Sequence, residues 1–253
     1  MPRILVTNDD GYQSPGLHAL ADALMALGEV IIVAPNAEAS AVGHALTLRR
    51  PLRLEHHGGH VYSVDGTPTD CVNIGVSQLL DGKPDMVVSG INKGLNIGDD
   101  VTYSGTVAGA LEGALLGYPA IAVSLQYTKG DWDFFPAATL AAALAGAVFT
   151  QGLPPRTFLN VNVPQGKLAG VRVTVQAKRN HITKVARRED PRGQAYFWIE
   201  EANDEWEPHD RSDQQAIQDG FASVTPLQPD LTDHGALAVI EALARAAVVG
   251  KAE

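Results

Sequence analysis

Nearly continuous apolar runs alternate with stretches of helical periodicity along the first 165 residues. Runs of this kind are expected for strands buried on both faces, and they cover residues 4–6, 29–35, 85–90, 120–125 and 158–163. Apolar residues recur at helical spacing in the stretches from 15 to about 25, from 67 to about 80, at 107–116 and at 134–149. Two short extended pieces, 46–54 and 61–64, flank the Gly58-Gly59 turn. The pattern predicts an α/β fold with a doubly wound, mostly parallel sheet.

After residue 165 the pattern changes. Residues 171–175 and 195–199 alternate apolar and polar positions, as antiparallel strands do, and the span 181–193 between them is charged and rich in turn residues. We expect a loop over 200–213, a short strand over 220–225 and a helix over 236–249, listed here in chain order. The sequence therefore predicts a core over 1–165 and a region over 166–253 that forms a hairpin extension and a closing helix of the same domain.

Two aromatic residues of the predicted hairpin, Phe197 and Trp198, bear on assembly. A long hairpin with exposed aromatic side chains often packs on a partner subunit, whereas the alternative is that both rings cover the base of their own hairpin. We favour the first interpretation, which predicts a homo-oligomer.

Composition restricts the partners and the compartment. The formal net charge is −10 over 253 residues, which disfavours binding to duplex nucleic acid or to an anionic membrane. Cys71 is the single cysteine, so no internal disulfide forms, and its position on an apolar stripe indicates a buried structural thiol. Neither a signal peptide nor an apolar run of membrane-spanning length is found, so we expect a cytoplasmic protein.

Oxygen-bearing side chains follow each of the first three core strands. Asp9 and Asp10 follow the first, Ser40 lies in the loop after the second, and Asn92 follows the third. Parallel strands end at one edge of the sheet, so these loops can converge there. Carboxylate, amide and hydroxyl oxygens suit Mg²⁺ or Mn²⁺. The alternative is that the two aspartates only cap a helix and solvate a turn.

A second group of residues favours phosphate. Ser104, Gly105 and Thr106 precede a predicted helix, where a glycine lets an anion approach and the helix N-terminus and hydroxyls donate hydrogen bonds. A plain helix cap would have the same sequence. A divalent cation opposite such a helix end would indicate metal-assisted hydrolysis of a phosphate ester.

Three other protein classes have acidic or glycine-rich loops after a strand, and the residues at particular positions of this chain argue against each of them. A haloacid-dehalogenase-type phosphatase spaces its two acids two apart, whereas Asp9 and Asp10 are adjacent and Gly11 follows them. A response-regulator receiver needs an aspartate at the end of its third strand, where Asn92 stands here. A dinucleotide-binding oxidoreductase needs Gly-x-Gly-x-x-Gly after its first strand, and this chain has none there.

Several ordered motifs resemble the SurE family, stationary-phase survival proteins that act as metal-dependent 5'/3'-nucleotidases. The resemblance covers nearly the whole chain and rests on segments 5–11, 14–16, 33–35 with Ser40, 66–72, 84–85, 88–92, 98–100, 103–108, 225–227 and 230–232. It departs where many members read Ala-Pro-Asp-Arg, because this chain reads Ala34-Pro35-Asn36-Ala37. That difference leaves the expected metal ligands in place but could alter substrate contacts beside Ser40.

The resemblance implies a function and a set of site residues. It implies a Rossmann-like core whose hairpin and C-terminal helix are exchanged in a homodimer, sometimes a homotetramer, and hydrolysis of nucleoside 5'-monophosphates with one Mg²⁺ or Mn²⁺ per subunit. Whether 3'-monophosphates and short polyphosphate are also cleaved stays open. The implied metal ligands are Asp9, Asp10, Ser40 and Asn92, and the implied phosphate contacts are Asn96, Ser104, Gly105 and Thr106.

Catalytic roles follow as a hypothesis. The metal would polarise a phosphoryl oxygen and activate a water that attacks in line, with Asp9 and Asp10 as the catalytic carboxylates. Asp9 could instead act as a covalent nucleophile or accept the proton of the water. His44, four residues after Ser40, is a candidate acid for the leaving alcohol, although a loop histidine is more often structural.

Overall fold

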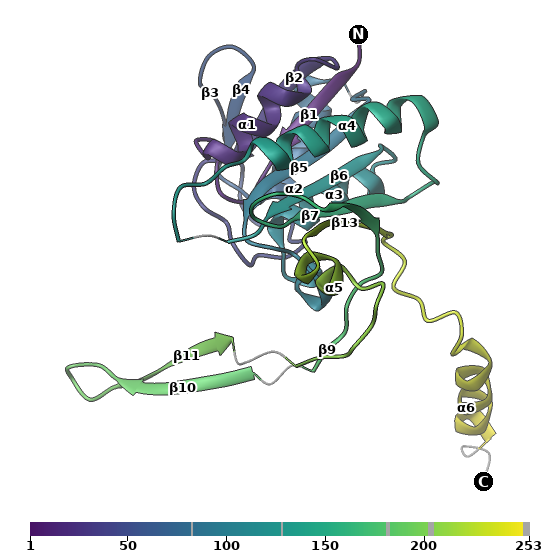
Figure 1. Cartoon of the computed structure of the whole chain (residues 1–253). Coiled ribbons are helices and arrows are strands. Elements are labelled where there is room, and N and C mark those ends of the chain that lie inside the picture. Colours follow the sequence, from purple (N-terminus) through teal and green to yellow (C-terminus); the bar gives the residue numbers. More distant parts are fainter. Residues whose placement is uncertain (82, 128, 181–182, 202–204, 250–253) are drawn as a thin grey trace.

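Successive side chains of the first strand face opposite sides of a sheet and thereby build two apolar layers. In β1 (Arg3–Thr7), Ile4 and Val6 pack with α1 (Pro15–Leu24) and α4 (Phe135–Gln151), whereas Leu5 packs with α2 (Pro68–Ile74) and α3 (Gly105–Leu115). The computed structural model describes residues 1–81, 83–127, 129–180, 183–201 and 205–249. Figure 1 shows these helices covering the two faces of the sheet, as the strand and helix alternation predicts.

Within the described residues the main sheet has nine strands in the order β3-β4-β2-β1-β5-β6-β7-β13-β8. Neighbouring pairs are parallel except β3 with β4 and β13 with β7, so the predicted mostly parallel sheet is confirmed. The remaining strands of this sheet are β2 (Glu29–Pro35), β3 (Leu54–His56), β4 (Val61–Val64), β5 (Met86–Lys93), β6 (Ala120–Leu125), β7 (Phe158–Val163), β8 (Gly170–Val173) and β13 (Phe221–Leu227).

Two helix starts near the sheet edge are defined by side-chain caps. Thr67 and Asp70 form a capping box at the start of α2, which continues into the π-helical turn η1 (Gly75–Leu79). Ser104 caps α3 by accepting a hydrogen bond from the backbone of Val107, and the 3-10 turn η2 (Gly98–Thr102) precedes it. The cap of α3 belongs to the predicted site, because Ser104 is one of the expected phosphate contacts.

A hairpin extension is present, but its strands differ from those that the sequence favoured. β10 (Thr183–Glu189) pairs antiparallel with β11 (Ala195–Glu201) and projects away from the sheet in Figure 1. β10 therefore occupies most of the span 181–193 that was expected to be a turn; residues 181–182 lie outside the described part. A smaller pair, β9 (Arg179–Asn180) with β12 (Glu205–Trp206), lies between hairpin and core.

The antiparallel expectation for 171–175 was wrong. β8 covers most of this segment and pairs in parallel with β13 at the edge of the main sheet. The alternation does not mark a core face here, because Val171 and Val173 are exposed whereas Gly170 and Arg172 are partly buried, and alternation alone fixes no strand direction. The expected loop over 200–213 was also too long, because β11 and β12 extend into it.

The last helices frame the C-terminal region. The sequence did not predict α5 (Asp213–Gln218), whereas α6 (Leu237–Val249) lies within one residue of its expected range. Side chains of α6 between residues 238 and 247 are exposed, and the helix stands apart from the sheet in Figure 1. The division at residue 165 stays a prediction, although β8 and β13 of the later region extend the core sheet.

Candidate active site

A tight turn after β1 places two adjacent carboxylates at the carboxyl edge of the sheet. The side chain of Asn8 donates to the carbonyl of Gly11 at 3.0 Å, and Gly11 has a φ of +95°, which favours glycine. The backbone of Tyr12 then donates to the carbonyl of Pro35, at the end of the neighbouring β2. Asp9 and Asp10 are fixed between these contacts.

Asp9 lies against the N-terminus of α3. Thr106 donates its hydroxyl hydrogen to Asp9 Oδ1 at 2.5 Å. A Cβ atom at Gly105 would lie 2.8 Å from Cβ of Asp9 and 3.0 Å from its Oδ2, so only glycine permits this approach. The Ser104-Gly105-Thr106 motif is thereby brought to the first aspartate across almost a hundred residues.

Both aspartates have raised pKa values. Burial raises the pKa of Asp9 to about 6; the bond from Thr106 opposes this shift, and the charge of Asp10 adds to it. Burial also raises the pKa of Asp10, while the charge of Lys93 opposes the rise and that of Glu38 adds to it. Asp9 is only 5% exposed. Two adjacent carboxylates, one buried and one partly buried, are stabilised by a bound cation.

The loop after β2 reaches the same place. The backbone of Ala39 donates to the carbonyl of Asp9 at 2.8 Å, which holds the neighbouring Ser40 beside the aspartates. Ser40 is exposed, and its hydroxyl donates to Glu38 at 2.8 Å. Glu38 is thus an additional carboxylate at the site that the sequence interpretation did not include.

Asn92 differs from its expected position in one respect. It lies within β5, which continues to Lys93, rather than after that strand. Its side-chain amide donates to the carbonyl of Gly94 at 3.0 Å, and the neighbouring Lys93 interacts with Asp10 through its charge and its backbone. β5 lies directly beside β1, so Asn92 belongs to the same sheet edge as both aspartates.

Asn96 is held by two asparagines of β7. Asn162 accepts a hydrogen bond from the backbone N–H of Asn96 at 2.8 Å and donates to its carbonyl at 3.0 Å. Asn160 donates to the same carbonyl at 2.8 Å, and the amide of Asn96 donates to Ser124 at 2.8 Å. Both strand asparagines are fully buried. This asparagine cluster fixes the loop that leads to η2.

Asp213 fixes the next part of that loop from α5. It accepts hydrogen bonds from the backbones of Gly98 and Ala177, each at 3.0 Å. Gln176 also donates to the carbonyl of Gly98 at 3.0 Å. The later third of the chain therefore shapes the site.

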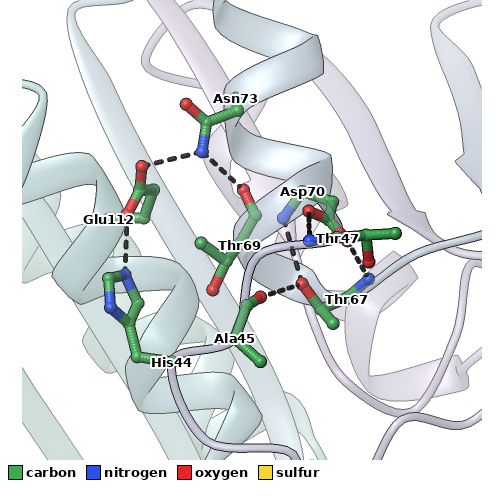
Figure 2. A network of polar contacts seen from close by, with 8 residues as sticks. All are labelled: His44, Ala45, Thr47, Thr67, Thr69, Asp70, Asn73 and Glu112. Atoms are coloured by element: carbon green, nitrogen blue, oxygen red, sulfur yellow. Dashed lines mark hydrogen bonds and ion pairs between the residues drawn. The ribbon is translucent and has the colours of Figure 1, made fainter. Parts of the chain in front are cut away.

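Thr106 and His44, like Ser40, Asn92 and Asn96, are already engaged in contacts within the protein. The hydroxyl of Thr106 is bonded to Asp9 and its side chain is fully buried, so it contacts the carboxylate in this structure. His44 Nε2 lies 2.6 Å from Glu112 Oε2, and Asn73 donates to the other oxygen of Glu112 at 2.7 Å. Figure 2 shows this chain of contacts running from the loop through α3 to α2.

The oxygen-rich set fits a hard divalent cation better than zinc. Among the described residues no group of three or more His, Cys, Asp and Glu side chains is arranged to hold a metal ion. Asp9 and Asp10 would thus need Ser40 and Asn92, with water, to complete a coordination shell, as Mg²⁺ and Mn²⁺ accept. The crowded carboxylates supply the negative charge that such a set requires.

Sequence reasoning missed three charged residues that border the site: Glu38, Lys93 and Glu112. A signal existed for Lys93, since it directly follows Asn92, one of the expected metal ligands. No sequence signal pointed to Glu112, because a glutamate within a helix is normally exposed and its partner His44 is 68 residues away.

Comparisons with known proteins identify the family. The family model described as "Survival protein SurE" matches residues 4–183. A protein from Geotalea daltonii named 5'-nucleotidase SurE is 51% identical over 242 residues, which cover 94% of this chain and 98% of that protein. One of the same name from Syntrophotalea carbinolica is 51% identical over 231 residues, 91% of this chain and 92% of its own length.

A solved structure is similar over nearly the whole chain. The crystal structure of the SurE protein from Aquifex aeolicus has a TM-score of 0.86 at 42% identity, covering 96% of this chain and 99% of that one. In the part of the chain that the structure describes, no helix combines the length and the apolar character needed to span a bilayer.

Proposed function

Because the chain belongs to the SurE family, we propose that it is a divalent-metal-dependent phosphomonoesterase that converts nucleoside 5'-monophosphates to nucleosides and phosphate. The observation that carries the proposal is the contact between Asp9 and the N-terminus of α3, through Thr106 and Gly105. A metal-binding carboxylate and a phosphate-binding helix end must lie this close for a phosphoryl group to contact both.

Asp9, Asp10, Ser40 and Asn92 are the proposed ligands of one Mg²⁺ or Mn²⁺. When bound, such an ion supplies Lewis acidity toward a phosphoryl oxygen and lowers the pKa of a coordinated water. The protein itself fixes the positions of the oxygen atoms that would bind the ion. Ala39 holds the Ser40 loop to Asp9, and Thr106 orients the Asp9 carboxylate, which can also accept the proton of the attacking water or attack phosphorus itself.

The start of α3 and the loop before it are the proposed phosphate-binding elements. Ser104 accepts a hydrogen bond from Val107, but a hydroxyl that accepts one bond still donates its hydrogen, so it can bind a phosphate oxygen. Gly105 carries no side chain of its own that could block an anion from the first backbone N–H groups of α3. Asn96, in the loop before η2, is buried and held in place by its hydrogen bonds. Thr106 contributes through Asp9, and His44 stays a candidate acid for the leaving alcohol.

Phosphate release from a panel of mononucleotides tests the reaction. The purified protein is given 5'- and 3'-mononucleotides and short polyphosphate with Mn²⁺ or Mg²⁺, and then EDTA. We expect release from 5'-monophosphates that EDTA abolishes and Mn²⁺ restores. An Asp9→Asn variant should lose at least about a hundredfold in kcat/KM, whereas Asp22→Asn, on the exposed side of α1, should match the wild type. Full activity of Asp9→Asn or activity in EDTA would contradict the proposal.

We further propose that the protein is a cytoplasmic homodimer or homotetramer joined through the hairpin and α6. Large apolar side chains that a monomer leaves exposed support this, and they are Phe197, Trp198 and Ile199 on β11 and Leu237, Val239, Ile240 and Leu243 on α6. Light scattering after size exclusion should give two or four times the chain mass of 26.8 kDa. A single-chain mass at micromolar concentration would contradict it.

A further inference from the structure

The segment that carries Ser40 lacks regular secondary structure and depends on other elements for its position. Residues 36–53 contain neither helix nor strand, and most of them are exposed. Ala41 has a φ of +56°, a conformation that side chains other than glycine rarely adopt. We call residues 39–47 the Ser40 segment. Its shape must be imposed by contacts with the rest of the protein.

Backbone contacts hold the site end of the Ser40 segment. Besides the bond from Ala39 to Asp9, the N–H of Gly43 donates to the carbonyl of Tyr103 at 3.0 Å, just before the cap of α3. These contacts place the segment between the end of β1 and the start of α3.

Side chains of the α2 capping box hold the other end of the Ser40 segment. Thr67 donates its hydroxyl hydrogen to the carbonyl of Ala45 at 2.7 Å, and Asp70 accepts from the N–H of Thr47 at 2.9 Å. Figure 2 shows both bonds beside the start of α2. The segment is therefore attached to two helices.

Between these ends, His44 joins the Ser40 segment to the side of α3. The side chain of His44 is 31% exposed, whereas that of its partner Glu112 is only 8% exposed. A carboxylate accepts and does not donate, so the proton of this bond belongs to Nε2 of His44. The amide of Asn73 fills the second oxygen of Glu112 and also donates to the carbonyl of Thr69, which leaves Glu112 no freedom to rotate away.

We propose that Glu112 is a positioning residue for the metal site: through His44 it holds the Ser40 segment in the shape that presents Ser40 beside Asp9 and Asp10. This inference rests on the proposed function, because it gives Ser40 its role as a ligand. Glu112 lies about two helical turns after the N-terminus of α3, so it acts through His44 and the segment. Residues that orient metal ligands in this way typically change metal affinity by about 10- to 100-fold when removed.

Glu112→Ala is the test variant, with Val72→Ala as its control. Val72 is a fully buried residue of α2 in the apolar layer that α2 and α3 form on the sheet, and its side chain forms no hydrogen bond, so its truncation should lower stability without removing a bond to the segment. Glu112→Gln keeps the volume, but one of the two oxygens that face His44 and Asn73 becomes an NH2 group, which donates and cannot accept. It should therefore fall between the wild type and Glu112→Ala.

Two readouts are independent of turnover. The Mn²⁺ dissociation constant is measured by electron paramagnetic resonance of free Mn²⁺, and hydrogen exchange is followed at the amides of Ala39, Gly43 and Thr47 in metal-free protein. We expect Glu112→Ala to weaken Mn²⁺ binding by at least about tenfold and to lose protection at these amides. Val72→Ala should leave the Mn²⁺ affinity within about twofold of the wild type, because it destabilises the fold without altering the site.

The outcomes separate this inference from the proposed function. Unchanged Mn²⁺ affinity of Glu112→Ala overturns the inference, whether or not the amides lose protection. Equal losses in Glu112→Ala and Val72→Ala also overturn it, since they would reflect stability alone. Wild-type protein that binds Mn²⁺ but releases no phosphate contradicts the proposed function and leaves the affinity comparison valid. Wild-type protein that binds no Mn²⁺ overturns both.

Discussion

The hydroxyl of Thr106 lies 2.5 Å from Oδ1 of Asp9 and joins the first turn of α3 to the end of β1. This bond favours the ionised form of a carboxyl group whose burial raises its pKa to about 6. Asp9 is a proposed metal ligand, and Thr106 lies at the helix end proposed to bind phosphate. The bond therefore connects the proposed metal site with the proposed phosphate site.

Thr106→Val should make the site more sensitive to acid. The variant keeps the shape of the side chain but removes the bond that lowers the pKa of Asp9, so that pKa rises further and less carboxylate is present near neutral pH. Mn²⁺ affinity in the wild type should weaken as pH falls below about 6, and in Thr106→Val this decline should begin at higher pH. Mn²⁺ titrations between pH 5 and 8 measure the shift.

Thr225→Val is the matched control for that experiment. Thr225, in β13, is also a buried threonine. Its hydroxyl lies 2.8 Å from the hydroxyl of Thr174, and this bond does not involve Asp9. The variant should leave the pH dependence of Mn²⁺ binding unchanged. Coincident pH curves for wild type and Thr106→Val would contradict the role assigned to this bond.

Asn162→Ala should lower the free energy of unfolding by about 3 kcal/mol. The substitution leaves the backbone N–H of Asn96 without its acceptor and removes one of two donors to its carbonyl, in a fully buried location. Urea denaturation monitored by circular dichroism gives the value. Ser223→Ala, at the paired position of β13, should be neutral or slightly stabilising, because the buried hydroxyl of Ser223 has no partner. Equal losses in both variants would contradict the interpretation.

Ala41→Gly should stabilise the protein by up to about 1 kcal/mol. A φ of +56° is unfavourable for alanine and easy for glycine, and this gain exceeds the extra entropy that glycine has in the unfolded chain. Ala39→Gly in the same segment should instead be neutral or destabilising, since Ala39 is not among the residues with positive φ. Urea midpoints of the two variants, compared with the wild type, decide between these signs.

The core strands could be predicted from the sequence because a strand that is buried on both faces consists almost entirely of apolar residues. β2, β6 and β7 begin and end where their apolar runs do. β10 was missed because its residues Thr183–Glu189 are mostly charged or polar, as expected for a strand that is not part of the core. The orientation of β8 depends on β13, some fifty residues later, and no local pattern reports such a pairing.

The candidate site was predictable only in part, for the same reason. Asp9, Asp10 and Asn92 are linked to one sheet edge by the rule that parallel strands end together. The hydrogen bond that engages Thr106 with Asp9, and the one that engages His44 with Glu112, join residues 97 and 68 positions apart. Such contacts depend on how helices pack on the sheet, which a single sequence does not reveal.

The bond between His44 and Glu112 should also give the protein an acid-labile component of stability. Burial raises the pKa of Glu112, but hydrogen bonds from His44 and Asn73 together outweigh it, and the net pKa lies below the ordinary value of 4.5. A folded-state pKa below the unfolded one means that the carboxylate stabilises the fold above pH 4.5 and that this contribution is lost as pH falls below it. Wild type and Glu112→Gln are therefore compared by urea denaturation from pH 6 to pH 3.5. The stability advantage of the wild type should be constant in the upper part of this range and should shrink in the lower part, because protonated Glu112 can no longer accept from both partners. A difference that stays the same down to pH 3.5 would show that Glu112 has the same pKa in the folded and unfolded states, and a difference that grows as pH falls would show a raised pKa in the fold.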